Sequence, residues 1–161
     1  MTFLDKTRGE TDRGRALVAA SVIEEMLEEV LKAFLLENSA TKKLFESGNA
    51  PLSTFSAKCS MSRALGLVSA EEYRDIEFVR KIRNAFAHSI LTSFEDNQIV
   101  SWAMAMKVGV AELETPNETS EVALDDPRER FSFVTTNLVL NFYNRAHYVR
   151  SHRLTEQNWP L

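Results

Sequence analysis

The sequence contains very little cysteine, glycine and proline. Its 161 residues include one cysteine, five glycines and four prolines. A disulfide and a C-x-x-C metal site each need two thiols, so the single Cys59 excludes both within one chain and favours a reducing compartment. Few breakers interrupt the long segments, whose apolar residues recur at three- and four-residue steps. The composition therefore predicts an all-α fold, and we expect no metal ion or cofactor.

Long apolar runs and a strong charge imbalance are also missing. No run approaches the length of a membrane span, and charged residues interrupt the first ten positions, so neither a membrane anchor nor a signal peptide is expected. The net charge of −4 argues against broad electrostatic binding to nucleic acid. We predict one cytoplasmic domain over residues 1–161, a bundle of about five or six helices with an N-terminal extension at 1–11.

Periodicity and cap residues divide the chain into helices. Asp12 is expected to cap a first helix that ends near residue 36. Its outer face carries Glu24, Glu25, Glu28 and Glu29, which we interpret as solvated, with a charge-complementary partner as the alternative. The other helices are predicted at 40–47, 53–65, 69–88, 96–106 and 126–152, and Gly66 is expected to be left-handed after the second of these. The helices at 69–88 and 126–152 are each expected to bury one apolar stripe: Phe78, Val79, Ile82, Ala85 and Phe86 in the first, and Phe131, Val134, Leu138, Phe142, Ala146 and Val149 in the second.

The segment from 107 to 125 shows no helical pattern. Its turn residues predict a long loop, which could include a short extended piece at 107–113. Loops of this length are usually functional or mobile, and the sequence does not decide between the two. Order returns at Asp126, with Pro127 at the first helical position. The last helix also carries an amide stripe, which we interpret as a solvated edge, with pairing across an interface as the alternative: Asn137, Asn141 and Asn144.

The segment at 69–88 is the most strongly marked helix, and it ends in a polar cluster. Ser69 and Glu72 have the spacing of a capping box. Arg83, Asn84 and His88 follow at the other end. On an ideal helix the step from Arg83 to His88 turns about 140°, whereas residues four apart share a face. If the helix ended before His88, the imidazole could swing back and meet Arg83 in a groove shared with a second subunit.

This cluster allows two interpretations. A neutral imidazole can take the proton of a ribose 2′-hydroxyl, and a guanidinium can stabilise the phosphorane, so Arg83 and His88, with Asn84 in support, suit metal-independent RNA cleavage. Alternatively, Asn84 and His88 bond the last free carbonyls of the helix. No glycine-rich phosphate loop, G-x-S-x-G elbow or basic recognition helix is present, so we do not expect this chain to bind DNA directly.

The order of several short runs resembles the mannitol operon repressor (MltR) family, and more closely its MltR-like branch. These runs are RALVAA at 15–20, APLSTFSAK at 50–58, ALGLV at 64–68, EEY at 71–73 and RKIRNAFAH at 80–88. The resemblance covers roughly residues 12–100. It implies an all-helical, bacterial, cytoplasmic regulator that lacks a DNA-binding motif and acts through protein partners.

The Arg83-Asn84 to His88 element is also similar to the motif of the HEPN superfamily, helical dimers that include RNases and inactive binding modules. We therefore expect an MltR-like regulator, a homodimer that acts through protein contacts rather than catalysis. The alternative is a HEPN-type metal-independent endoribonuclease with RNA as substrate, using Arg83 and His88 with Asn84. A third interpretation is an adaptor in which the cluster is only a helix end.

Overall fold

Six helices of eight residues or more make up most of the part of the chain that the structure describes. The computed structural model describes residues 10–46, 49–113 and 124–160. Its elements, in chain order, are α2 (Asp12–Phe34), α3 (Ser39–Glu46), α4 (Phe55–Ala64), α5 (Ala70–His88), α6 (Asn97–Met104), the single turn α7 (Val110–Leu113), α8 (Pro127–Val149) and the 3₁₀ turn η1 (Arg150–His152). Those ranges contain no strand, so the predicted all-α bundle of about five or six helices is confirmed.

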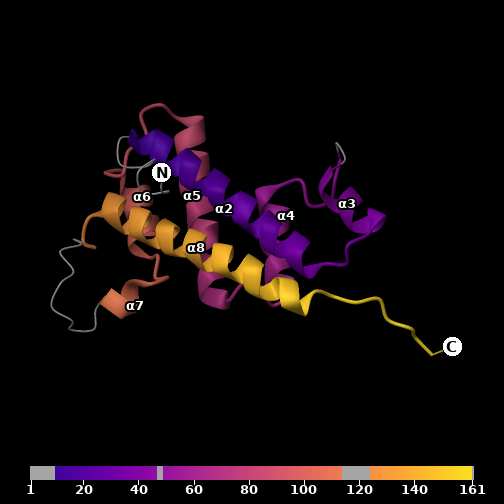
Figure 1. Ribbon diagram of the computed structural model, residues 1–161. Coiled ribbons are helices and arrows are strands. Elements are labelled where there is room, and N and C mark those ends of the chain that lie inside the picture. The colour runs from indigo at the N-terminus through magenta and orange to yellow at the C-terminus, as the bar shows by residue number, and fades with distance from the viewer. Residues whose placement is uncertain (1–9, 47–48, 114–123, 161) are drawn as a thin grey trace.

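The two longest helices, α2 and α8, lie side by side and run in the same direction (Figure 1). Near their N-terminal ends, Arg128 Nε lies 2.7 Å from Asp12 Oδ1. Near their C-terminal ends, Arg153 Nε donates to the Ala33 carbonyl at 3.1 Å. The inward stripe predicted for α8 is buried throughout: Phe131, Val134, Leu138, Phe142, Ala146 and Val149. Together with the buried stripe of α2, which includes Ile23, Leu27 and Leu31, it forms one wall of the core.

Helix α5 crosses behind α2 and α8 in the view of Figure 1 and supplies the opposite wall of the core. Its predicted apolar stripe is confirmed at Val79, Ile82 and Phe86, which are fully buried. Helix α4 packs against α2 and α5, and α6 packs against α5 and α8. The Phe94 ring lies 5.2 Å from the rings of both Phe86 and Phe131, so aromatic contacts join α5 to α8.

The helix ends follow local sequence signals closely. The predicted capping box of α5 is confirmed, because Ser69 Oγ accepts from Glu72 N at 3.1 Å and Glu72 Oε2 accepts from Ser69 N at 2.9 Å. Gly66 follows α4 with the predicted left-handed conformation, at φ 72°. The predicted cap of α2 is wrong, because Thr11 is the N-cap residue and Asp12 is the first residue of the helix.

The acidic face predicted on α2 is solvated only in part. Glu25 and Glu29 are exposed, as predicted. Lys58 of α4, however, is buried, and its Nζ lies 3.0 Å from Glu24 Oε1 and 2.8 Å from Glu28 Oε2. Burial by itself lowers the pKa of Lys58, but the two carboxylates outweigh it and raise the pKa. Half of the acidic run therefore joins α2 to α4.

Residues 107–113 fold into a turn and a short helix. The predicted extended piece is wrong, because α7 occupies its second half. Asp75 of α5 holds the first half, since its Oδ2 accepts from the backbone N–H groups of Lys107 and Val108 at 2.7 Å each. A buried carboxylate thus replaces the backbone pairing that a strand would need.

Gly109 completes this turn with φ 77°. A Cβ atom there would lie 2.8 Å from Cγ of Asn137 on α8. Both the conformation and the close approach therefore favour glycine. Most of the predicted N-terminal extension (residues 1–9) and of the predicted loop (residues 114–123) lies outside the described residues. No described helix is both long and apolar enough to cross a membrane.

Candidate functional site

The predicted Arg83-Asn84-His88 site lies at the C-terminal end of α5. The helix includes His88, and the cap residue Ser89 donates its backbone N–H to the Ala85 carbonyl at 3.2 Å. Arg83 and His88 are both exposed. Because the helix does not end before His88, Arg83 and His88 are separated by the full turn of about 140° and do not converge within one chain.

The three side chains do not act as a helix cap either. Arg83 Nη1 donates to Asn84 Oδ1 at 3.0 Å. The Ala85 carbonyl is occupied by the backbone of Ser89 and by Thr92 Oγ1, which donates at 3.3 Å. Within the described part of the chain, the His88 ring has no hydrogen bond or ion pair. The imidazole is therefore open to a ligand or a second subunit.

Arg83 and Asn84 line a shallow hollow of about 340 Å³ that His88 does not border. Its other lining residues come from α2, the start of α4 and α5: Glu24, Ser53, Thr54, Phe55, Ser56 and Arg80. Arg80 is held by Glu77 through two hydrogen bonds of 2.8 and 3.2 Å. One chain thus presents a guanidinium in this hollow and an imidazole outside it, without a shared substrate position.

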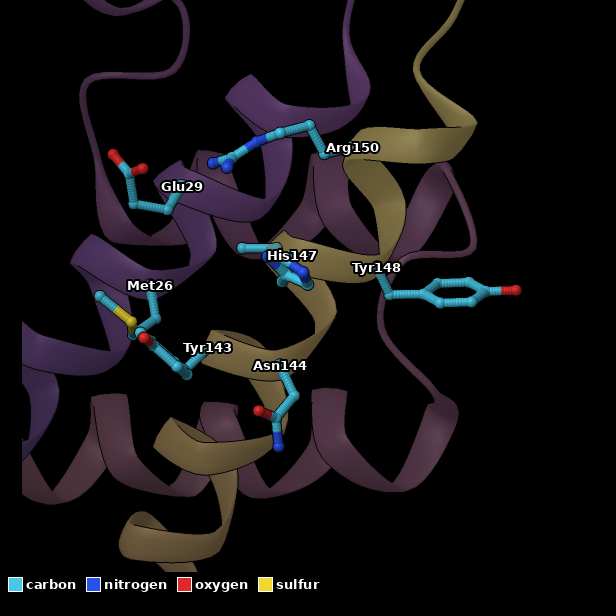
Figure 2. A pocket seen from close by; sticks show the side chains of 8 residues that line it. Met26, Glu29, Tyr143, Asn144, His147, Tyr148 and Arg150 are labelled. Carbon is cyan, nitrogen blue, oxygen red and sulfur yellow. The ribbon is translucent and has the colours of Figure 1, made fainter.

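A larger groove of about 640 Å³ lies along the outer side of the α2/α8 pair. Figure 2 shows Met26 and Glu29 reaching it from α2, and Tyr143, Asn144 and His147 from α8, with Arg150 at the end. Ala146 and Tyr148 complete the lining, and the Tyr148 ring points away from α2 in this view. We call this feature the α2/α8 groove.

The α2/α8 groove has the chemistry of a binding surface. Tyr143 and Tyr148 are 67% and 65% exposed, and Leu140, one turn before Tyr143, is 54% exposed. Opposite charges stand at its rims, Glu29 on α2 and Arg150 at the start of η1. Exposed aromatic side chains flanked by charge are typical of protein interfaces. In the described part of the chain, no group of three or more His, Cys, Asp or Glu residues is placed to hold a metal ion.

Comparison with known proteins agrees with this helical arrangement. No family model and no curated protein sequence matches the chain. A solved structure does, the X-ray structure of the MtlR-HPr complex from Escherichia coli, with a TM-score of 0.61 over 91% of this chain and 95% of that one. The chain is similar in fold to MtlR. The predicted resemblance to the mannitol operon repressor family therefore holds for the fold.

The likeness to MtlR is one of architecture. The two sequences are 19% identical, and a shared fold does not by itself carry a shared activity. The comparison does not test the HEPN-like motif, so the roles of Arg83, Asn84 and His88 remain predictions.

Buried ion pairs hold the MtlR-like bundle together, and sequence analysis did not find them. Arg145 of α8 donates to both carboxylate oxygens of Glu72, at 2.7 and 2.8 Å. Burial raises the pKa of Glu72, but hydrogen bonds from Arg145 and Ser69 outweigh it and lower the pKa. For Asp75 burial prevails over the N–H groups of the 107–108 turn, and its pKa is raised. These groups join helices and lie outside both hollows described above.

The lining of the α2/α8 groove was also missed. Asn144 was assigned to a solvated amide edge, and Tyr143 was not singled out. The sequence did contain a signal for it. Leu140 and Tyr143 are three residues apart and lie outside the inward stripe of α8, so this pair of large side chains must face outward.

Proposed function

We propose that this chain is a regulator-type protein that acts by binding protein partners, in a bacterial cytoplasm, and not through catalysis or a DNA-binding motif of its own. The observation that carries the proposal is the similarity in fold to MtlR, found in a complex with HPr, over almost the whole of both chains. HPr, or a protein of the same kind, is therefore the first partner to test. A homodimer is part of the same proposal.

The surface of the molecule supports a protein partner over DNA. The net charge is −4, and the first turn of α5 exposes the carboxylate of Glu71. A phosphate backbone would be repelled there, whereas the α2/α8 groove offers exposed aromatic side chains of the kind that protein interfaces bury.

Titration of the full chain with purified HPr in a calorimeter tests this proposal. We expect one saturable site per chain with a dissociation constant in the micromolar range, and no heat with an unrelated protein of similar size and charge. Absence of binding up to about 100 µM HPr would remove HPr as the partner. In a parallel gel-shift assay at low salt, a shift of duplex DNA that weakens steeply with added salt would contradict the absence of direct DNA contact.

A metal-independent endoribonuclease is the second candidate, favoured by one observation: Arg83 and His88 are both exposed, and the His88 ring has no partner within the described residues. A two-fold dimer that placed Arg83 of one chain beside His88 of the other would restore the missing convergence. His88 would then take the 2′-hydroxyl proton, and Arg83 would stabilise the phosphorane.

Cleavage of labelled tRNA and single-stranded RNA in EDTA decides this candidate. The variants are Arg83→Ala and His88→Ala, with His152→Ala as a matched control because His152 is an exposed histidine on a different element. Cleavage that persists in the control and disappears in both site variants would establish the nuclease and displace the regulator proposal. An inactive wild-type protein would remove the nuclease.

A further inference from the structure

The C-terminal segment 155–160 leaves the helical body without packing on it. Its last ties to the body are Arg153, which donates to the Ala33 carbonyl at 3.1 Å, and Leu154, whose N–H donates to the Phe34 carbonyl at 2.8 Å. Beyond them, the hydrogen bonds recorded for this segment are those from Gln157 Nε2 to Thr155. Figure 1 shows the segment leading away from the ends of α2 and α8.

Trp159 stands near the end of this segment and is 82% exposed. Tryptophan offers one of the largest apolar surfaces of any side chain, and proteins usually bury most of it. The single chain therefore leaves a large apolar surface unburied on this short segment.

The α2/α8 groove has the right chemistry for an indole. Met26 and Tyr143 supply a thioether and an aromatic ring, both of which pack well against aromatic faces. Arg150 adds a guanidinium, which stacks on indole more strongly than on other rings. The volume of about 640 Å³ falls in the range of sites that enclose a bulky side chain with its neighbours.

Charge complementarity orients the segment in the groove. The charged side chain of residues 155–160 is Glu156. On the α8 side of the groove, Arg150 has no ion pair with a described residue, and His147 lies one turn earlier. Glu29 on the α2 side would repel Glu156. The carboxylate is therefore expected on the α8 rim, which leaves the indole over Met26 and Tyr143.

The geometry favours the groove of a second chain over the chain's own. Leu154 is fixed beside Phe34, eight residues and about 12 Å of helix beyond Met26, and the segment continues away from it. Five residues extend at most about 17 Å, so Trp159 could return to its own groove only by reversing direction directly after Leu154. A two-fold axis near the C-terminal ends would instead place each segment against the other chain's groove, with two identical contacts.

We propose that the α2/α8 groove is the docking site for residues 155–160 of a second copy of this chain, with Trp159 over Met26 and Tyr143. Each copy then places its segment in the groove of the other, and we call this pair of contacts the strap. This inference deepens the homodimer of the proposed function, and it does not depend on HPr.

Sedimentation velocity over about 1–200 µM tests the strap with three full-length variants. We expect a dimer for the wild type, and dissociation constants raised about tenfold or more by Trp159→Ala or by Tyr143→Ala. Leu91→Ala, which alters another highly exposed apolar residue, on the loop after α5, should have no effect. A monomeric wild type, or a Trp159→Ala variant that dimerises as well as the wild type, overturns the proposal.

Mixing the two weakened variants distinguishes exchange of the C-terminal segments from direct packing of one groove face on the other. Trp159→Ala keeps an intact groove and Tyr143→Ala keeps an intact segment, so a mixed dimer has one complete contact while either homodimer has none. Stronger association in the mixture than in either variant alone is the expected result, and no recovery refutes the exchange. In a Trp102→Phe background, which leaves Trp159 as the sole tryptophan, protection from acrylamide at every protein concentration would instead indicate docking within one chain. HPr titration of the same variants is a separate measurement, so a failed strap and a failed partner are distinguishable.

Discussion

Replacement of Asp75 by alanine should destabilise the protein strongly, although Asp75 lines neither hollow. Its Oδ2 accepts hydrogen bonds from the N–H groups of both Lys107 and Val108 at 2.7 Å, and the side chain is fully buried. Without it, both donors lose their acceptor, at a cost of about 1–3 kcal/mol each. Burial leaves the carboxylate itself poorly solvated and raises its pKa, so its removal offsets part of that cost. We expect a net loss of about 2–4 kcal/mol.

Urea unfolding followed by far-UV circular dichroism measures this loss, and Asp75→Asn is the matched control. Both N–H groups bond to the same oxygen, so an asparagine carbonyl placed at Oδ2 can accept both. The other oxygen, Oδ1, has no hydrogen-bond partner and lies 3.7 Å from Nε of the exposed Arg74, so an amide nitrogen there breaks no hydrogen bond and gives up one weak ion pair. Asp75→Asn should therefore cost less than about 1 kcal/mol. Equal losses for the alanine and asparagine variants would refute the argument.

The wild type and Asp75→Asn also provide a test of how stability depends on pH. Burial raises the pKa of Asp75 in the folded state, so the folded protein binds this proton more readily than the unfolded chain does. Stability from this group must then increase as the pH falls through the folded pKa. The stability of wild type relative to Asp75→Asn should accordingly rise between neutral and mildly acidic pH. A difference that falls instead would show that the two N–H groups outweigh burial.

Three further predictions concern the fold. Arg145→Met should lower the free energy of unfolding by about 2–4 kcal/mol at pH 7 and by less at acid pH. The lowered pKa of Glu72 contributes stability that is lost as the pH falls through the folded pKa. Urea unfolding curves that give the same loss at both pH values would contradict this. Gly109→Ala should lower the melting temperature more than Gly66→Ala. Both glycines have a positive φ, but only at Gly109 would a Cβ atom crowd a neighbouring side chain, that of Asn137. Equal shifts would show that the Asn137 side chain moves aside. Cys59 is buried with its pKa raised to about 12, so Ellman's reagent at pH 8 should label it only as fast as the protein opens, and immediate labelling would contradict the buried thiol.

The parts of the fold that sequence analysis predicted correctly depend on contacts within a few residues. The capping box of Ser69, the left-handed Gly66 and the inward stripe of α8 are all patterns spanning one or two helical turns. The parts that it missed depend on distant partners. Lys58 lies 34 residues from Glu24, and Asp75 lies 33 residues from Val108, so nothing beside either residue indicated its partner.

The predicted site illustrates a different limit. The nuclease interpretation needed the helix to end before His88, and the exact end of a helix is the least certain feature of a periodic pattern. The α2/α8 groove could not be predicted from the sequence for a different reason. It exists only because two helices more than a hundred positions apart run in parallel with their inward stripes matched, which leaves Tyr143 on the outside.

The parallel pairing of α2 with α8 also has a consequence in time. Arg128 follows its partner Asp12 by 116 residues, so a ribosome adding about 5–20 residues per second reaches Arg128 roughly 6–23 s after it adds Asp12. During this interval the stripe that contains Ile23 and Leu27 has no α8 to cover it. A growing chain therefore presents to chaperones the surface that every finished copy conceals, and the groove between the two helices is among the last features of the molecule to form.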